Sequence, residues 1–117
     1  MKTTLSFVTL HTTDYPAALA FFTDILGFEQ TETRPGATAF VAAGGAGLAL
    51  RAHGGLTPPL GVGVTVYFTV PDVQAFHDEV VARGAVISEP LHDMPFGRTF
   101  TVQAPDGQGL GFWQEPA

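Results

Sequence analysis

An internal repeat constrains the fold of this chain more than any other feature. Segments 36–51 and 97–114 share one plan, in which a glycine precedes a threonine and an apolar strand, and a turn leads to a second strand beginning Gly-Leu. The first glycines of the two segments, Gly36 and Gly97, are 61 residues apart. β-Branched and aromatic runs on either side of a glycine turn are typical of β-hairpins. The sequence therefore predicts the same hairpin twice.

The segments before the two hairpins match as well, since 6–28 and 65–87 resemble each other in order and kind. The chain thus contains two copies of a unit of about sixty residues. One unit of that size buries too little apolar surface to be stable alone, so we expect a single domain of 117 residues. We divide it into a first unit, 1–53, a Gly/Pro-rich linker, 54–63, and a second unit, 64–117.

Composition excludes several classes of function. Hydrophobic residues make up 45% of the chain and charged residues 14%, which is typical of a globular protein. A net charge of −6 with five basic residues argues against nucleic-acid binding, which requires clustered Lys and Arg. The chain has no cysteine for a disulfide or a thiolate metal site. No apolar run approaches membrane-spanning length and the start does not resemble a secretory signal, so we expect no membrane partner and a cytoplasmic location.

In the first unit, residues 4–11 alternate in polarity as a strand with two different faces does. Asp14 is a suitable N-cap for a helix over 15–26, whose apolar residues form one stripe. The remaining strands of this unit are expected at 28–34 and, as a hairpin across the glycines at 44–45, within 37–53.

The second unit repeats this order. Residues 64–70 alternate, Asp72 begins a helix that turns Val73, Phe76, Val80 and Val81 inward, and Gly84 ends it. The remaining strands are expected at 85–89, 97–103 and 109–115.

Each unit is therefore a βαβββ arrangement, and the predicted fold class is α+β. A helix covers only one face of an antiparallel four-stranded sheet, so the other face must meet something else. Two such curved sheets would enclose a cup lined by aromatic rings and hydroxyl groups, which suits a small-molecule ligand.

Three motifs give the chain a resemblance to a known family: TTDYPAALAFFTDILGF at 12–28, DVQAF at 72–76 and PDGQGLGFW at 105–113. Together with the repeat, they resemble the vicinal oxygen chelate superfamily. That superfamily includes glyoxalase I, extradiol dioxygenases, fosfomycin-modifying transferases and bleomycin resistance proteins. The resemblance covers nearly the whole chain and implies two βαβββ units curving around a cup. It also implies a divalent metal held by His or Gln on the first strand and Glu on the last strand of each unit.

The positions that match the family's metal ligands carry unsuitable side chains. They are Phe7 and Thr65 on the first strands and Ala49 and Gly111 on the last strands. A catalytic divalent metal needs about three N, O or S ligands from the protein. The resemblance is therefore to a member without the family metal, as in the bleomycin resistance proteins, and we predict no metal and no other cofactor.

Strand parity gives the candidate ligand-binding residues on the cup face. Arg51 either reaches solvent at the rim or pairs with an anionic group inside. Of the four histidines, His11 shares the cup face, His53 lies beside the linker, His77 is expected to face solvent and His92 to lie in a loop. The candidate set is Phe7, Thr9, His11, Phe40, Arg51, Thr65, Tyr67, Thr99, Thr101 and Trp113.

Two functions fit these features. In the first, the protein binds or sequesters a small aromatic or apolar molecule without catalysis, and the acidic surface favours a cationic one. In the alternative, it is a glyoxalase-like lyase or dioxygenase with a non-standard site near His11, although no catalytic residue can be assigned. A cup filled by its own side chains is a third possibility. The predicted partners are a small-molecule ligand and a second copy of the chain in a homodimer.

Overall fold

The computed structural model describes residues 1–40 and 46–116. The chain divides into two compact units, Met1–Pro58 and Pro59–Ala117. Each unit contains a four-stranded sheet and a helical segment in the order βαβββ, so the predicted α+β class with two repeated units is confirmed. The glycine turn expected at 44–45 lies outside the described residues. No helix within the described ranges has both the length and the apolar character of a membrane span.

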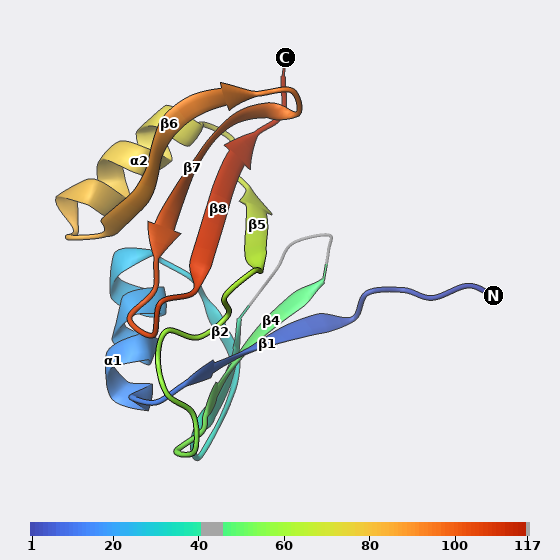
Figure 1. The fold of residues 1–117 in the computed structure, drawn as a ribbon, viewed down its shortest axis with the longest axis vertical. Coiled ribbons are helices and arrows are strands. Elements are labelled where there is room, and N and C mark those ends of the chain that lie inside the picture. Colours follow the sequence, from blue (N-terminus) through green and yellow to red (C-terminus); the bar gives the residue numbers. More distant parts are fainter. Residues whose placement is uncertain (41–45, 117) are drawn as a thin grey trace. The chain divides into compact units, whose positions relative to one another are not determined.

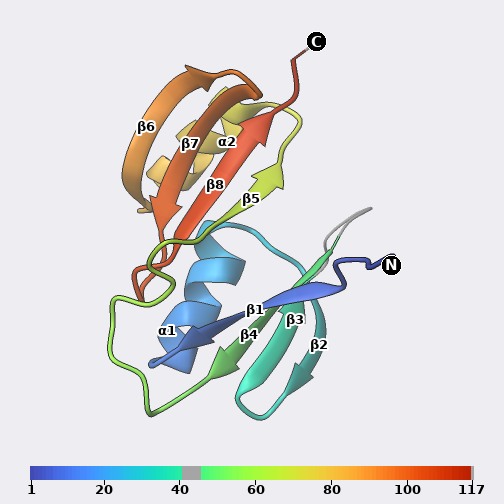
Figure 2. The same ribbon diagram turned by 45° about the vertical axis from the view of Figure 1, so that its right-hand side comes forward.

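The first unit begins with a strand and a capped helix, as its sequence predicts. The side chain of Asp14 accepts a hydrogen bond from the backbone N–H of Ala17 at 3.2 Å, which satisfies one of the free donors at the helix start. The sheet order is β1-β4-β3-β2 (Figure 2). The elements are β1 (Phe7–Thr12), α1 (Tyr15–Ala20), the π-helical η1 (Phe21–Ile25), β2 (Gln30–Arg34), β3 (Ala37–Phe40) and β4 (Gly47–Ala52).

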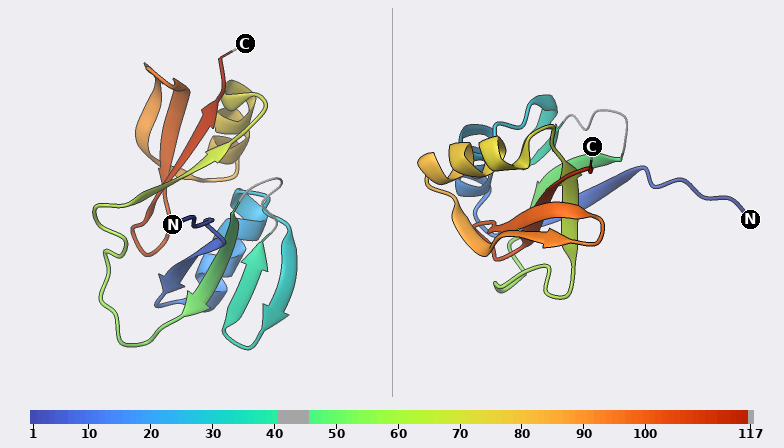
Figure 3. Two further views of the ribbon diagram at one scale, coloured as in Figure 1. Left: turned by 90° about the vertical axis from the view of Figure 1, so that its right-hand side faces the viewer. Right: turned by 90° about the horizontal axis from the view of Figure 1, so that it is seen from above.

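The second unit has the same topology, with sheet order β5-β8-β7-β6 (Figure 1). Asp72 caps its helix by accepting from the N–H of Ala75 at 3.0 Å, and Gly84 ends it with a φ of +96°. The helix lies along one face of the sheet and contacts β6, β7 and β8 (Figure 3). The elements are β5 (Thr65–Thr69), α2 (Val73–Ala82), β6 (Val86–Met94), β7 (Gly97–Gln103) and β8 (Gly109–Gln114).

Both sheets are mixed, so the expectation of purely antiparallel sheets is wrong. β1 pairs with β4 in parallel, and β5 pairs with β8 in parallel, whereas the remaining pairs are antiparallel. The reason is the helix that follows the first strand of each unit. It carries the chain across the sheet, and such a crossover connection permits parallel pairing with the last strand.

β6 is longer than the strand predicted at 85–89 and includes His92, which the sequence placed in a loop. Pro90 suggests a strand end, because proline lacks the N–H that a central strand needs. β6, however, is the outer strand of its sheet, and an edge strand tolerates proline. Val81, predicted to face inward from α2, is 44% exposed.

Phe40 belongs to the core and not to the open face of the first sheet, so the predicted face is wrong. It is 3% exposed, and its ring lies 5.4 Å from that of Phe22 in η1 and 5.9 Å from that of Phe28. Its register partner Leu48 is also buried beneath the helical segment. Burial of so large an apolar ring is strongly favourable, which explains why Phe40 occupies this side of β3.

The core of the second unit is likewise aromatic. The ring of Phe112 lies 4.6 Å from that of Phe76 on α2 and 5.6 Å from that of Phe100 on β7. These side chains fill the helix-covered face. Among the described residues of this unit, no helix lies on the opposite face of the sheet, and the candidate site lies there.

Candidate functional site

Three aromatic rings gather on the open face of the second sheet. Tyr67 on β5 meets Phe96 edge to face at 5.7 Å, and Phe96 meets Trp113 on β8 in the same way at 5.6 Å. Tyr67 is 47% exposed and Phe96 40% exposed, although edge-to-face rings of this size are usually buried. We call Tyr67, Phe96 and Trp113 the aromatic trio. An exposed cluster of this kind offers both apolar area and ring edges to a flat ligand.

Gly111 makes room for Tyr67. The two residues are register partners on β8 and β5. A Cβ built on Gly111 would lie 2.4 Å from Cε1 and 2.5 Å from Cδ1 of the Tyr67 ring, far inside van der Waals contact. The ring therefore lies across the glycine, and any side chain at position 111 would displace it.

Gly97, the first residue of β7, likewise leaves room for Trp113. Its φ of +145° is one that residues with a side chain rarely adopt. A Cβ there would lie 2.4 Å from the backbone oxygen of Gln114 and 3.1 Å from Cε3 of Trp113. The glycine thus allows the turn that carries Phe96 to approach the tryptophan.

The predicted threonines share the face of the aromatic trio but differ in exposure. Thr99 and Thr101 are the register partners of Trp113 and Gly111, and both are buried. The Thr99 hydroxyl donates to the backbone oxygen of Phe112 at 2.7 Å. Thr65, the partner of Gly109, is exposed. Of these three hydroxyls, that of Thr65 is therefore the most accessible to a ligand.

A hollow of about 340 Å³ opens at the ends of β5 and β8, next to the aromatic trio in the sheet. Thr69, which lines it, is the register partner of Trp113. The volume of this hollow lies at the lower end of the range for small-molecule pockets. A smaller hollow of about 150 Å³ in the first unit is lined by Glu32, Arg34, Ala37, Thr38 and Ala49.

The open face of the first sheet is more polar. Phe7 is 64% exposed at the start of β1. Thr9 and His11 follow on the same face, and Arg51 is the register partner of His11 on β4. The ring of His53 meets that of His11 edge to face at 5.5 Å. The structure therefore brings His53, which the sequence placed beside a flexible linker, into direct contact with a predicted site residue.

The side chains at the family's metal positions do not fit a metal ion. Phe7, Ala49 and Gly111 have no side-chain donor atom, and the space above Gly111 contains the Tyr67 ring. Thr65 alone provides an oxygen. Across residues 1–40 and 46–116, no three His, Asp or Glu side chains gather closely enough to hold a metal.

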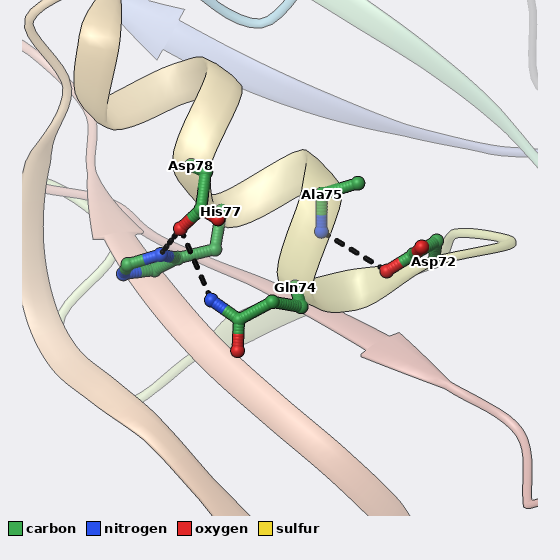
Figure 4. A network of polar contacts seen from close by, with 5 residues as sticks. All are labelled: Asp72, Gln74, Ala75, His77 and Asp78. Atoms are coloured by element: carbon green, nitrogen blue, oxygen red, sulfur yellow. Dashed lines mark hydrogen bonds and ion pairs between the residues drawn. The ribbon is translucent and has the colours of Figure 1, made fainter.

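A polar network on α2 lies apart from this face (Figure 4). His77 Nδ1 and Gln74 Nε2 each donate to Asp78 Oδ1 at 3.0 Å. The hydrogen bond from His77 is the main cause that lowers the pKa of the Asp78 carboxyl, and the hydrogen bond from Gln74 lowers it further. The His77 side chain is only 22% exposed because its ring packs on Phe100 at 5.0 Å, so the expectation that it faces solvent is wrong. The Asp78 side chain itself is 64% exposed, so the network lies on the solvent side of α2.

Sequence reasoning did not select Phe96 or His92 as site residues. Phe96 lies in the turn between β6 and β7, and turn residues were not assigned to a face. The signal that could have found it is the repeated glycine at 97, because a residue beside a turn glycine approaches the neighbouring strand closely. His92 was missed because β6 extends beyond Pro90.

Comparison with known proteins agrees with this fold. The bleomycin-binding protein of Streptomyces verticillus, solved with copper(II)-bleomycin, has a TM-score of 0.76 at 22% identity, covering 99% of each chain. A glyoxalase/bleomycin resistance protein/dioxygenase from Nocardioides has a TM-score of 0.79 at 23% identity, covering 98% of this chain and 85% of that one.

At the level of sequence, CFP32 of Mycobacterium tuberculosis, named as a candidate glyoxylase, is 30% identical over 118 residues. The match covers 95% of this chain but 45% of that protein, so the chain spans less than half of its length. The model of the Glyoxalase/Bleomycin resistance protein/Dioxygenase superfamily matches residues 4–112. The repeated βαβββ units and this match across nearly the whole chain show that it belongs to the glyoxalase/bleomycin resistance protein/dioxygenase superfamily.

Proposed function

We propose that this protein binds a small, flat, aromatic or apolar molecule on the aromatic trio and acts by holding it, without the family metal. The observation that carries the proposal is the position of the Tyr67 ring across Gly111. The Tyr67 ring occupies the space beside position 111, to which the resemblance assigns a carboxylate metal ligand on the last strand. A surface of aromatic rings that lacks metal-ligating side chains favours the stacking of a flat ligand over the binding of a metal ion.

The free energy of such binding is modest. A ligand that buries about 200 Å² of apolar surface gains about 5 kcal/mol, before the cost of ordering the ligand. Micromolar affinity therefore requires polar contacts as well. Thr65 is the candidate for such a contact beside the aromatic trio. On the open face of the first unit, Thr9, His11 and Arg51 are candidates for contacts with a ligand bound to that face. Thr99 and Thr101 would contribute to the shape of the binding surface and not through their hydroxyl groups, because both residues are buried.

The Streptomyces verticillus neighbour supports this class of function, since it was solved with copper(II)-bleomycin bound. Bleomycin itself is therefore one probe, and 2-methoxynaphthalene is a simpler one. The net charge of −6 favours neutral and cationic compounds over anions.

Tryptophan fluorescence tests the proposal directly, because Trp113 is the only tryptophan. We expect saturable quenching by 2-methoxynaphthalene or bleomycin. By calorimetry, Trp113→Ala should weaken the binding at least tenfold, as the loss of a central aromatic contact does. Arg83→Ala is the matched control, since Arg83 is the exposed C-cap residue of α2 and pairs with Glu79 on that helix, which packs on the other face of the sheet from the aromatic trio. Equal binding to Trp113→Ala and to the control would refute the proposal.

The second candidate function is a glyoxalase-like lyase or dioxygenase centred on His11. One observation favours it, namely the His53 ring at 5.5 Å from that of His11, with Arg51 beside it. Two imidazoles could bind a metal ion away from the family position, but a third protein ligand would still be needed. Glyoxalase and dioxygenase assays with added Ni²⁺, Zn²⁺, Mn²⁺ or Fe²⁺ separate the two functions. Activity that is lost in His11→Ala would establish the second.

A cytoplasmic location and a homodimeric state complete the proposal. Cell fractionation with an antibody against the protein tests the first. Sedimentation equilibrium tests the second.

A further inference from the structure

His92 lies on the same open face as the aromatic trio. It is the register partner of Thr99, which is in turn the partner of Trp113. Paired residues on neighbouring strands point to the same side of a sheet, and strands lie about 4.8 Å apart. The Cα atoms of His92 and Trp113 are therefore separated by two strand spacings, about 10 Å. A flat molecule of two fused rings can bridge such a distance.

The imidazole of His92 has a defined donor and acceptor. Its Nδ1 lies 2.7 Å from the backbone oxygen of Pro90. A carbonyl oxygen only accepts hydrogen bonds, so this contact places the proton on Nδ1. In the neutral ring, Nε2 is then an acceptor. His92 is half-buried, which leaves part of the ring accessible.

An irregularity in β6 brings a second polar residue to the same face. The register shifts between Glu89 and His92, so that Glu89 opposes Thr101 while His92 opposes Thr99. Bulges of this kind redirect side chains, and they are common next to binding sites. The Glu89 carboxylate repels anions, so an acidic ligand would be disfavoured beside His92.

We propose that His92 determines ligand specificity, with Nε2 accepting a hydrogen bond from the hydroxyl group of a neutral planar phenol whose rings lie on the aromatic trio. The inference rests on the proposed function and narrows its ligand to hydroxyaromatic compounds. Aromatic carboxylates are disfavoured by the charge of Glu89, and ring systems without a donor lose the contact with His92.

Three probes of the same ring system test this specificity: 2-naphthol, 2-methoxynaphthalene and 2-naphthoate. In the wild-type protein we expect 2-naphthol to bind about three- to tenfold more tightly than 2-methoxynaphthalene, which is the range that one hydrogen bond contributes. The anion 2-naphthoate should bind most weakly. Titration followed by Trp113 fluorescence and by calorimetry provides the three dissociation constants.

The variant His92→Phe keeps a ring at this position but removes the acceptor. It should bind 2-naphthol and 2-methoxynaphthalene equally, with the affinity for 2-methoxynaphthalene unchanged. His77→Phe is the matched control, because the His77 ring packs on Phe100 on the helix side of the sheet. This control should retain the wild-type preference for the hydroxyl group.

A nuclear magnetic resonance measurement reports on His92 without relying on affinity. Long-range nitrogen–hydrogen spectra should show the Nδ1-protonated form of His92, and 2-naphthol should shift its Nε2 signal while 2-methoxynaphthalene does not. Equal affinity of the wild type for these two probes, or a hydroxyl preference that persists in His92→Phe, would overturn the inference while leaving the proposed function intact. Failure of every probe to bind at millimolar concentration would overturn both.

Discussion

The ring of Tyr67 lies across Gly111 so closely that a Cβ on the glycine would be 2.4 Å from its Cε1 atom. Of these two residues, Gly111 stands at the position that the resemblance assigns to a metal ligand on the last strand. The Tyr67 ring therefore occupies the space that a side chain at position 111 would need. A carboxylate could not be restored at this position without moving the tyrosine.

The first prediction concerns this contact. We expect Gly111→Ala to lower the free energy of unfolding by about 1 to 2 kcal/mol, because the new methyl group overlaps the Tyr67 ring. Gly109→Ala is the matched control. A Cβ there would lie 3.5 Å from Thr65 Oγ1, an ordinary contact, so its effect should stay within about 0.5 kcal/mol. Urea unfolding provides both values.

A double variant separates the contact from other effects of the substitution. In a Tyr67→Ala background the ring is absent, so Gly111→Ala should cost much less than in the wild type. Additive costs of the two substitutions would show that the overlap with Tyr67 is not the cause.

The second prediction tests the place of Phe40 in the core. Phe40→Ala should lower the free energy of unfolding by about 3 to 5 kcal/mol, as loss of a buried phenylalanine does. Phe7→Ala removes the same atoms from a side chain that is 64% exposed, and should change stability by less than about 0.5 kcal/mol. Similarly small losses in the free energy of unfolding for both variants would contradict this prediction and would indicate that Phe40 lies on the open face.

The third prediction concerns pH. Hydrogen bonds from His77 and Gln74 hold the pKa of the Asp78 carboxyl below its usual range. Since the folded pKa is lowered, the stabilisation is present above the unfolded pKa and is lost as pH falls through the folded pKa. Carboxyl-detected nuclear magnetic resonance should show this pKa rising in His77→Ala and, to a smaller extent, in Gln74→Ala. An unchanged pKa in both variants would contradict the network.

The fourth prediction is that no stoichiometric divalent metal occupies the family position. Phe7, Ala49 and Gly111 provide no donor atom, and one threonine oxygen from Thr65 is too few. Elemental analysis after dialysis against Ni²⁺, Zn²⁺, Mn²⁺ or Fe²⁺ is the measurement. About one bound ion per chain, lost on chelation, would contradict it.

The fifth prediction is a homodimer. Each sheet has two outer strands, β1 and β2 in the first unit and β5 and β6 in the second, and exposed edges of this kind are commonly covered in stable assemblies. Sedimentation equilibrium should give twice the chain mass. A monomer at micromolar concentration would count against the prediction.

Local patterns in the sequence were sufficient to predict most of the elements. The repeat, the N-caps Asp14 and Asp72 and the alternation in β1 and β5 each depend on neighbouring residues, and the structure contains all of them. The exposed face of Tyr67 follows from the same alternation.

The tertiary structure decided what depends on contacts between distant residues. The pairing of β6 with β7 extends β6 past Pro90 and brings His92 to the open face, and packing against η1 turns Phe40 into the core. The crossing helices make each sheet mixed. The sequence alone therefore determined the units and their strands, because hydrophobic alternation and caps act locally. The aromatic trio depended on the close approach of Phe96 to Tyr67 and Trp113, which only the folded sheet brings about.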